Sequence, residues 1–234
     1  MVVCVCFLAL SCSNDKKDAA PLETPSPNAP VKTVEFPIDG SLTPISVDKK
    51  TRQTRGISIT CPVVSGTRHD TEINGIIDSK VDIFVKELAS DADVVDFSIK
   101  YNNKGILSML ISGYDSKNST DTVIRHLALN FNTASGREIE IDSLFDNTAG
   151  DWNKALSEQV NAMAQLNGIN LYKDVDDVTR ASFYLTENSI TLIFALYQIA
   201  PYPAGEPAFT LEYISIRAYT SSAGAISVIM NKHE

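Results

Sequence analysis

Apolar residues in the first half of the chain follow two periodicities. They alternate with polar residues from Ile57 to Val64, which is typical of a half-buried strand. From about residue 71 to 89 they recur at three- and four-residue spacing, which predicts a helix with Asp70 as a candidate N-cap. Alternation then returns and predicts a series of antiparallel strands over 95–101, 106–112, 122–131 and 137–141. We therefore expect a meander with the helix packed on one face.

The second half again has a helix followed by strands. The helix is predicted from about Asp151 to Asn167, with Gly168 placed to end it. A hairpin and two further apolar runs are interpreted as strands over 182–185, 189–196, 209–216 and 225–230. No strand–helix–strand alternation of the parallel-sheet type is recognisable. We predict an α+β fold of antiparallel sheets with two main helices, in which two similar-sized modules, 32–145 and 146–234, share a core.

The N-terminal residues are typical of an exported protein. Residues 1–11 are uncharged and mostly apolar, and because a membrane-spanning helix needs about 20 residues, we interpret them as a signal peptide. The stretch from Leu8 to Cys12 resembles a bacterial lipoprotein cleavage box, in which Cys12 becomes the lipidated first residue. The alternative is a buried N-terminal strand that contains an ordinary cysteine.

Residues 12–31 favour the lipoprotein interpretation. They are polar, rich in proline and poor in large apolar side chains, so they cannot bury enough surface to offset their ordering entropy. We expect a disordered, lipidated tether that holds the following domain away from a membrane. The predicted location is the bacterial cell envelope, lipid-anchored and extracytoplasmic, on the periplasmic or surface-facing side.

Composition argues against several functions. The chain has 234 residues, of which 29 are acidic and 20 basic, and its formal net charge of −9 makes nucleic acid an improbable partner. Cys61 lies in an alternating apolar run, so we expect a buried thiol. We predict no metal, no cofactor and no catalytic residues, because no spacing typical of such sites occurs around His69, His126, His233 or the aspartates at 174, 176 and 177.

The segment from Tyr197 to Pro207 has the most informative pattern. Its three prolines fix φ and hold the preceding residues extended, and Gly205 accepts positive φ. A stiff loop that presents an aromatic ring is a good recognition element. The alternative is a structural corner whose tyrosines pack inward. We take as candidate ligand-binding residues, with Glu206 as the charge partner of a basic ligand, Tyr197, Gln198, Tyr202, Gly205 and Glu206.

The residues around this loop resemble a known bacterial module. The sequence FYLTENSITLIF at 183–194, followed by YQIAPYPAG at 197–205, looks like a C-terminal module in which a Y-x-I-A-P-Y-x-x-G loop follows a strand hairpin. Upstream, ISITCPVVSG at 57–66 and the helix after it look like the module that usually precedes it. Over roughly residues 52–216 the pair resembles the ectodomain of RsiV-type lysozyme-sensing anti-sigma factors and the non-catalytic region of PdaC-type peptidoglycan deacetylases.

This resemblance implies an extracytoplasmic α+β fold and, in one branch, binding of lysozyme. The sequence shows no internal transmembrane helix, no sigma-binding segment and no deacetylase domain, so we expect the binding half alone on its lipid tether. The leading hypothesis is a non-enzymatic envelope lipoprotein that binds a protein or glycan, such as a cationic lysozyme-like enzyme. One alternative is an accessory module that binds or processes peptidoglycan or another glycan, and another is a structural lipoprotein without a soluble ligand.

Two structural features distinguish the first two hypotheses. An acidic cleft around Tyr202 without converging carboxylates favours binding of a cationic protein. Two facing carboxylates in a pocket favour a module that acts on glycans.

The lipoprotein hypothesis leads to the first testable prediction. Replacing the modified cysteine in Cys12→Ala should move the protein from the membrane to the soluble fraction, because acyl chains stabilise membrane binding by roughly 0.8 kcal/mol per buried methylene. Fractionation, together with the mass of the N-terminal peptide, checks this. Wild-type protein that is soluble and carries no lipid mass on Cys12 contradicts the hypothesis.

Overall fold

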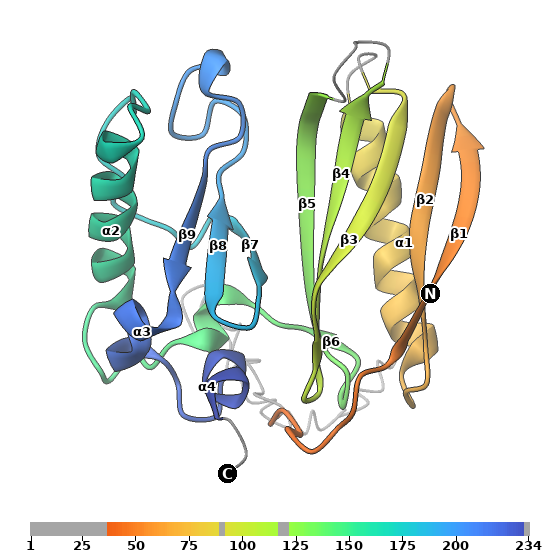
Figure 1. Cartoon of the computed structure of the whole chain (residues 1–234), viewed down its shortest axis with the longest axis horizontal. Helices are drawn as coiled ribbons and strands as arrows, with labels where there is room; N and C mark the ends of the chain where they lie inside the picture. The colour runs from red at the N-terminus through yellow and green to blue at the C-terminus, as the bar shows by residue number, and fades with distance from the viewer. Residues whose placement is uncertain (1–36, 89–91, 117–121, 232–234) are drawn as a thin grey trace, which may run out of the picture. The chain divides into compact units, whose positions relative to one another are not determined.

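The computed structural model describes residues 37–88, 92–116 and 122–231, with only the backbone described for 122–124. Residues 35–234 form one compact unit. The segments 1–11 and 12–31, with Cys12, and also His233 lie outside the described residues, so the predictions made for them stay predictions. The described part of the chain contains a six-stranded and a three-stranded sheet (Figure 1).

The first sheet is built by the first half of the chain. Its elements are β1 (Ser46–Thr54), β2 (Ile57–Ser65), α1 (Asp70–Glu87), β3 (Val94–Asn103), β4 (Ile106–Asp115), β5 (Thr122–Asn132) and β6 (Arg137–Glu138). The strands lie in chain order, and all neighbours are antiparallel except β2 and β3. This parallel pair is connected by α1, so the expectation that no strand–helix–strand unit occurs is wrong here.

The helix α1 covers one face of this sheet, as its apolar spacing predicted (Figure 1). Its buried side chains are Ile73, Ile77, Val81, Phe84 and Val85, and they pack into a hydrophobic cluster with residues of β2, β3, β4 and β5. Asp70 is the first helical residue rather than the N-cap. Its carboxylate instead accepts hydrogen bonds from Thr67 and Gly66, which lower the pKa of this group and close the turn before the helix.

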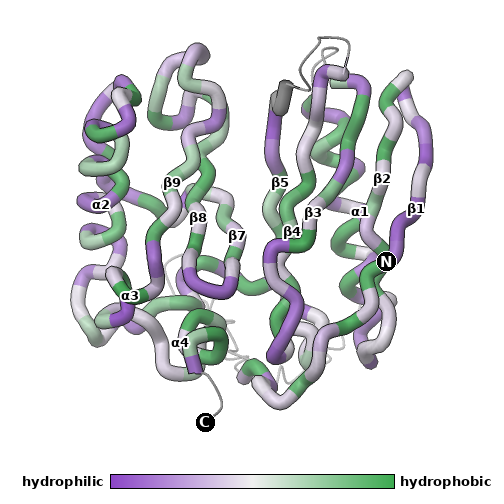
Figure 2. Tube along the Cα trace, in the orientation of Figure 1, coloured by the Kyte–Doolittle hydropathy of each residue, from purple (hydrophilic) through white to green (hydrophobic). Residues whose placement is uncertain are grey.

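The edge strand β1 was not predicted from the sequence. Its nine residues, SVDKKTRQT, are exposed or half-buried throughout, and they are drawn mostly purple in Figure 2. Pairing with β2 over its whole length, from Ser46–Ser65 to Thr54–Ile57, holds this polar segment as a strand. Charged side chains on an outer strand also protect the sheet edge from pairing with other chains.

The second half of the chain forms the three-stranded sheet and its helices. The elements are η1 (Ile141–Leu144), α2 (Trp152–Leu166), β7 (Ser182–Leu185), β8 (Ser189–Ile193), η2 (Tyr202–Ala204), β9 (Ala208–Glu212), α3 (Tyr213–Ile216), η3 (Arg217–Tyr219) and α4 (Ala225–Met230). The sheet order is β7-β8-β9, all antiparallel. Asp151 caps α2 by accepting a hydrogen bond from the Lys154 amide at 3.0 Å. No helix among the described residues is long and apolar enough to cross a membrane.

Two predicted strands at the end of the chain are wrong in part or in full. The strand expected over 209–216 ends at Glu212, where its pairing with Ser189 ends, and Tyr213 to Ile216 form α3. The apolar run at 225–230 is α4 and not a strand. A short apolar run fits a buried strand and a buried helical turn equally well, so periodicity does not separate them.

The predicted fold class is confirmed. The structure has antiparallel-rich sheets and two long helices, and its buried apolar residues form two clusters. One lies between the first sheet and α1. The other is built mainly from the second half of the chain but also contains Ile106, Ile139, Ile141, Leu144 and Phe145, so both predicted modules contribute to it.

A buried polar link joins the two sheets. Ser108 and Asn130 are paired on β4 and β5, and the Ser108 hydroxyl donates to Asn130 Oδ1 at 2.7 Å. Asn130 Nδ2 donates to the Phe183 carbonyl at 2.7 Å, and the Leu185 amide donates to Ser108 Oγ at 2.8 Å. The backbone groups of Phe183 and Leu185 that β8 leaves unpaired are thereby satisfied by side chains of the first sheet.

We predict that this link is a major contribution to stability. Asn130→Ala should lower the free energy of unfolding by about 2 kcal/mol, because it leaves the Phe183 carbonyl buried without its donor. Urea titration of the two proteins measures this. The exposed Asn170 is the matched control, since Asn170→Ala should change stability by less than about 0.5 kcal/mol; equal effects at the two positions contradict the assignment.

Candidate functional site

The residues between β8 and β9, 194–207, form what we call the tyrosine loop, seen at the top of Figure 1. Its two ends are held together by the Phe194 amide, which donates to the Pro207 carbonyl at 2.9 Å. Phe194 is fully buried and packs edge-on against Phe209, with ring centroids 5.9 Å apart. The base of the loop is therefore part of the core.

Internal hydrogen bonds fix the rest of the loop. The Gln198 side chain accepts from the Ala195 amide at 2.8 Å, and the Gln198 amide donates to the Ala195 carbonyl at 3.0 Å. After Pro201, the short η2 turn is closed by the amides of Ala204 and Gly205. Gly205 has φ of 63°, which glycine adopts without strain. Gln198 and Gly205 thus shape the loop.

Tyr197 and Tyr202 are presented at the surface. Their side chains are among the exposed large hydrophobic groups, at 61% and 63% relative exposure. The two rings stack on each other, with centroids 5.9 Å apart and planes 29° apart. Tyr197 also has positive φ, 63°, a conformation that is uncommon for a residue with a side chain. The loop therefore holds two rings together and outward rather than packing them into a corner.

Glu206 was predicted to contact a ligand, but its side chain lies buried in the protein. Its side chain is only 4% exposed. The carboxylate accepts hydrogen bonds from the His126 amide at 2.7 Å and from Arg125 Nε at 3.2 Å, and His126 Nδ1 lies 3.0 Å away. Arg125 and His126 belong to β5, so Glu206 anchors the tyrosine loop to the first sheet. Its charge therefore interacts with groups of the protein itself, whereas it was predicted as the charge partner of a basic ligand.

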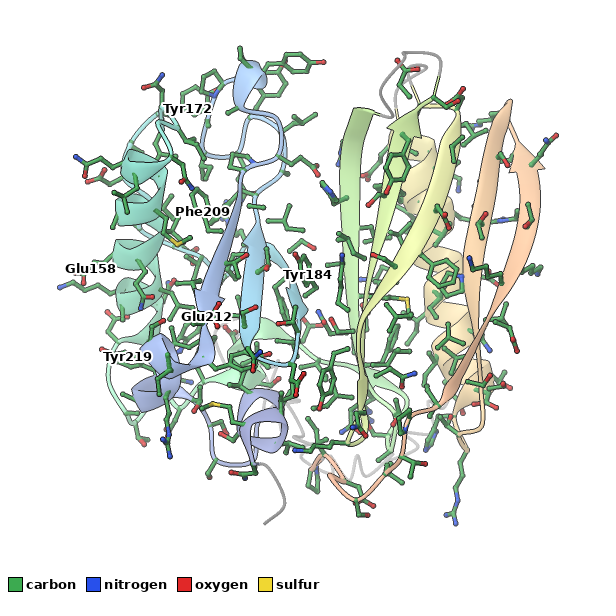
Figure 3. The ribbon with its side chains drawn as sticks, in the orientation of Figure 1. Glu158, Tyr172, Tyr184, Phe209, Glu212 and Tyr219 are labelled. Carbon is green, nitrogen blue, oxygen red and sulfur yellow. The ribbon has the colours of Figure 1, made fainter. Side chains whose placement is uncertain are left out.

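A third exposed tyrosine lies beside the loop. Tyr172 is 59% exposed, and its amide donates to the Ile199 carbonyl of the loop at 2.9 Å. Figure 3 shows Tyr172 near the end of α2, at the same end of the sheet as the loop. Sequence analysis missed it because nothing in the local pattern around Tyr172 connects it with a loop that follows much later in the chain.

An acidic groove of about 630 Å³ runs between the two segments. Its charged lining residues are Asp174, Asp176 and Asp177 together with Lys173 and Arg180, which leaves a net negative charge, and Gln198 and Ile199 line it from the tyrosine loop. Lys173 at 2.9 Å lowers the pKa of the Asp176 carboxyl, and hydrogen bonds from Thr179 lower that of Asp177. Asp174 and Asp176 are exposed to solvent, and all three aspartates lie along the groove beside the tyrosine loop.

Histidine, cysteine and carboxylate side chains are the possible metal ligands among the described residues. Among them, no group of three His, Cys, Asp or Glu side chains is arranged to hold a metal ion. His69 lies 3.9 Å from Glu72, and His126 is bound to Glu206. Cys61 is buried as predicted, and burial raises the pKa of its thiol.

Residues 138–213 match the model of a family described as a protein of unknown function (DUF3298). The matched region runs from β6 to the first residue of α3 and contains the whole tyrosine loop. The second half of the chain is therefore similar to the DUF3298 family over this region. No curated protein matches the chain significantly.

Several solved structures resemble the chain, and two of them are described as DUF3298 family proteins. One is a member of the DUF3298 family from Bacteroides fragilis, 14% identical, with 83% of this chain and 100% of that chain covered and a TM-score of 0.55. The other is a DUF3298 family protein from Pseudomonas aeruginosa, 10% identical, with 79% and 97% covered and a TM-score of 0.51. At these identities the likeness establishes a shared fold.

The anchoring role of Glu206 can be tested by stability. Glu206→Ala should lower the free energy of unfolding by about 2 kcal/mol, because Arg125 and the His126 amide lose a largely buried acceptor. Glu158 on α2 has a side chain that is 68% exposed, so Glu158→Ala is the control and should cost less than about 0.5 kcal/mol. Urea titrations that give the same value for both variants show that Glu206 is not an anchor.

Proposed function

We propose that this protein is a non-enzymatic binding protein of the bacterial cell envelope, and that the tyrosine loop is its recognition element. The observation that carries the proposal is the stacked, exposed pair of Tyr197 and Tyr202 on a loop fixed at its base and by Glu206. Exposed aromatic rings give large contact areas, and a loop that is already ordered loses little entropy on binding.

The proposed ligand is a cationic protein of the lysozyme type. The acidic groove next to the rings supports this, as does the net charge of −9, because complementary charge speeds the encounter of binding partners. The Y-x-I-A-P-Y-x-x-G motif also lies within the region that matches DUF3298, which supports a relation to the RsiV-type ectodomains named above. A peptidoglycan fragment is the alternative ligand, since aromatic rings also stack on sugars.

We also propose that the protein is attached to the membrane through a lipid on Cys12. The support for this is the cleavage-box pattern from Leu8 to Cys12 and the proline-rich polar composition of residues 12–31. Such an anchor places the tyrosine loop outside the cytoplasm, where a lysozyme-like enzyme or a peptidoglycan fragment is met.

The test uses the full-length Cys12→Ala chain, which carries no lipid, and calorimetry with a lysozyme and separately with soluble peptidoglycan fragments. Tyr202→Ala should weaken binding of the lysozyme at least about tenfold, because truncating a central aromatic anchor commonly costs about 2 kcal/mol or more. Tyr202→Phe should retain most of the affinity.

Ile99→Ala, on β3, is the control for loss of an exposed apolar side chain and should leave affinity unchanged. A melting curve of each variant verifies the fold. If Tyr202→Ala binds as the wild type does, the loop is not the recognition element. If only the peptidoglycan fragments bind, the ligand is a glycan and the proposal of a protein ligand is wrong.

A further inference from the structure

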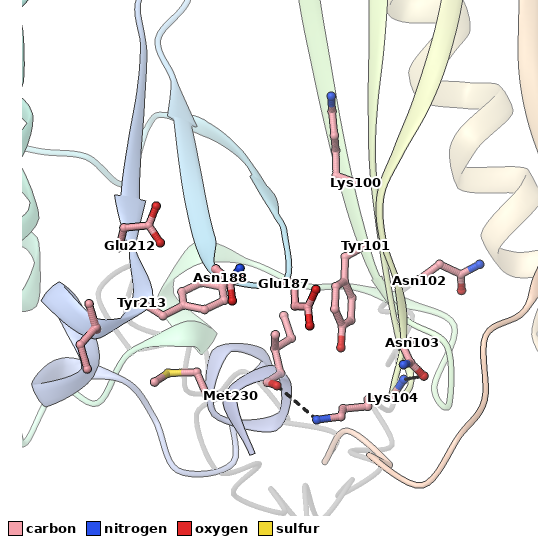
Figure 4. Close-up of a pocket in the computed structure, with 12 residues that line it drawn as sticks. Lys100, Tyr101, Asn102, Asn103, Lys104, Glu187, Asn188, Glu212, Tyr213 and Met230 are labelled. Carbon is pink, nitrogen blue, oxygen red and sulfur yellow. Dashed lines mark hydrogen bonds between the residues drawn. The ribbon is translucent and has the colours of Figure 1, made fainter. Parts of the chain in front are cut away.

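A second cavity, of about 890 Å³, lies at the other end of the β8–β9 pair from the tyrosine loop (Figure 4). Its walls come from the end of β3 and the turn after it, the turn between β7 and β8, the junction of β9 with α3, and the end of α4. No part of the proposed recognition element contributes to it. The volume is in the range of small-molecule sites.

Hydrogen bonds connect the elements that form the walls of this cavity. The Tyr213 amide donates to the Asn188 carbonyl at 2.8 Å, and the Tyr213 hydroxyl donates to the Thr186 carbonyl at 2.9 Å. Lys104 Nζ, from the β3–β4 turn, donates to the carbonyls of Val228 and Ile229 at 3.2 Å and also to that of Asn231. The shape of the cavity is therefore fixed by hydrogen bonds between its walls.

The two lysines of the cavity walls interact with groups other than its carboxylates. The Lys104 ammonium group donates hydrogen bonds to carbonyls at the C-terminal end of α4, where a positive charge is stabilising. Lys100 Nζ lies 5.1 Å from the centre of the Tyr184 ring, and Figure 4 shows its side chain pointing away from Glu187 and Tyr101. In the described part of the chain, neither ammonium group forms an ion pair with Glu187 or Glu212.

The other polar groups of the cavity are accessible to a ligand, since Glu187, Asn188 and Glu212 are exposed and Tyr101 is half-buried. Within the described residues, no hydrogen bond or ion pair engages the carboxylates of Glu187 and Glu212, the Tyr101 hydroxyl or the side-chain amide of Asn188. Figure 4 shows the Glu187 carboxylate beside Tyr101, and Glu212 apart from it, with Tyr213 and Asn188 between them. Burial, and then the charge of Glu187, raises the pKa of Tyr101, so its hydroxyl keeps its proton.

We infer that this cavity binds a small organic cation with a primary ammonium group, either an amino sugar oligomer or a linear polyamine. Two separate carboxylates favour a ligand with more than one positive or hydrogen-bond-donating group. The rings of Tyr101 and Tyr213, together with Met230, supply apolar walls, and aromatic faces also attract ammonium groups. The inference does not depend on the function proposed for the tyrosine loop.

Calorimetry at low ionic strength with the full-length Cys12→Ala chain tests this. The probes are tri-glucosamine, tri-N-acetylglucosamine, which has the same sugar skeleton without ammonium groups, and spermidine. Tri-glucosamine should bind at least about tenfold more tightly than its acetylated form. Binding of spermidine as well shows that the ammonium group suffices, and binding of tri-glucosamine alone shows that the sugar is also recognised. Equal affinity for the acetylated trimer, or no binding of either cation, overturns the inference.

Variants then locate the binding. Glu187→Gln and Glu212→Gln should each raise Kd at least fivefold, and the double variant should abolish measurable binding, because each removes one anionic contact without changing the shape of the side chain. Glu158→Gln, with the same change of charge on α2, and Tyr202→Ala, in the tyrosine loop, should leave Kd unchanged. Melting curves verify that all variants fold. Cation binding that survives in the double variant overturns the assignment to this cavity.

Discussion

The buried hydrogen bonds from Ser108 and Asn130 to β7 are the interaction on which the rest of the structure depends. A three-stranded sheet leaves one edge of β7 without a strand partner, and its amide and carbonyl groups become costly when they are buried against another sheet. The polar pair on β4 and β5 meets this requirement at Phe183 and Leu185. Because β7 in turn pairs with β8, this link determines where the tyrosine loop and the cavity are placed.

The tyrosine loop illustrates how a surface element is made rigid by contacts that are hidden from its sequence. Prolines and Gly205 limit its backbone, but the contact that holds it in place runs from Glu206 to Arg125 and His126 on β5. A buried carboxylate with several donors is stable only if the donors stay in place. The rings of Tyr197 and Tyr202 are therefore held by both halves of the chain, which keeps the ordering cost of recognition low.

Sequence periodicity predicted the long elements and the hairpin of β7 and β8, and it failed at the polar β1 and at the short helices α3 and α4. The repeated apolar spacing of α1 and α2 leaves little ambiguity, whereas α4 has only six residues and was interpreted as a strand. The polar β1 carries no apolar alternation at all and forms because β2 offers a complete pairing edge. In the site, the exposure of the two tyrosines agrees with the predicted recognition loop. The anchoring of the loop by Glu206 and the position of Tyr172 beside it depend on tertiary contacts, which no local sequence pattern encodes.

The family match and the solved structures bear on different parts of this arrangement. The matched region contains the tyrosine loop, Glu187 and Glu212, but the partners of Glu206 on β5 and the β3–β4 turn with Tyr101 and Lys104 lie before residue 138. The matched region alone therefore lacks the anchor of the tyrosine loop and one wall of the cavity. The two DUF3298 structures are covered at 100% and 97% of their length by most of this chain, so their fold includes the preceding sheet. The preceding sheet is thus the support that orients the loop at one end of β8 and β9 and closes the cavity at the other.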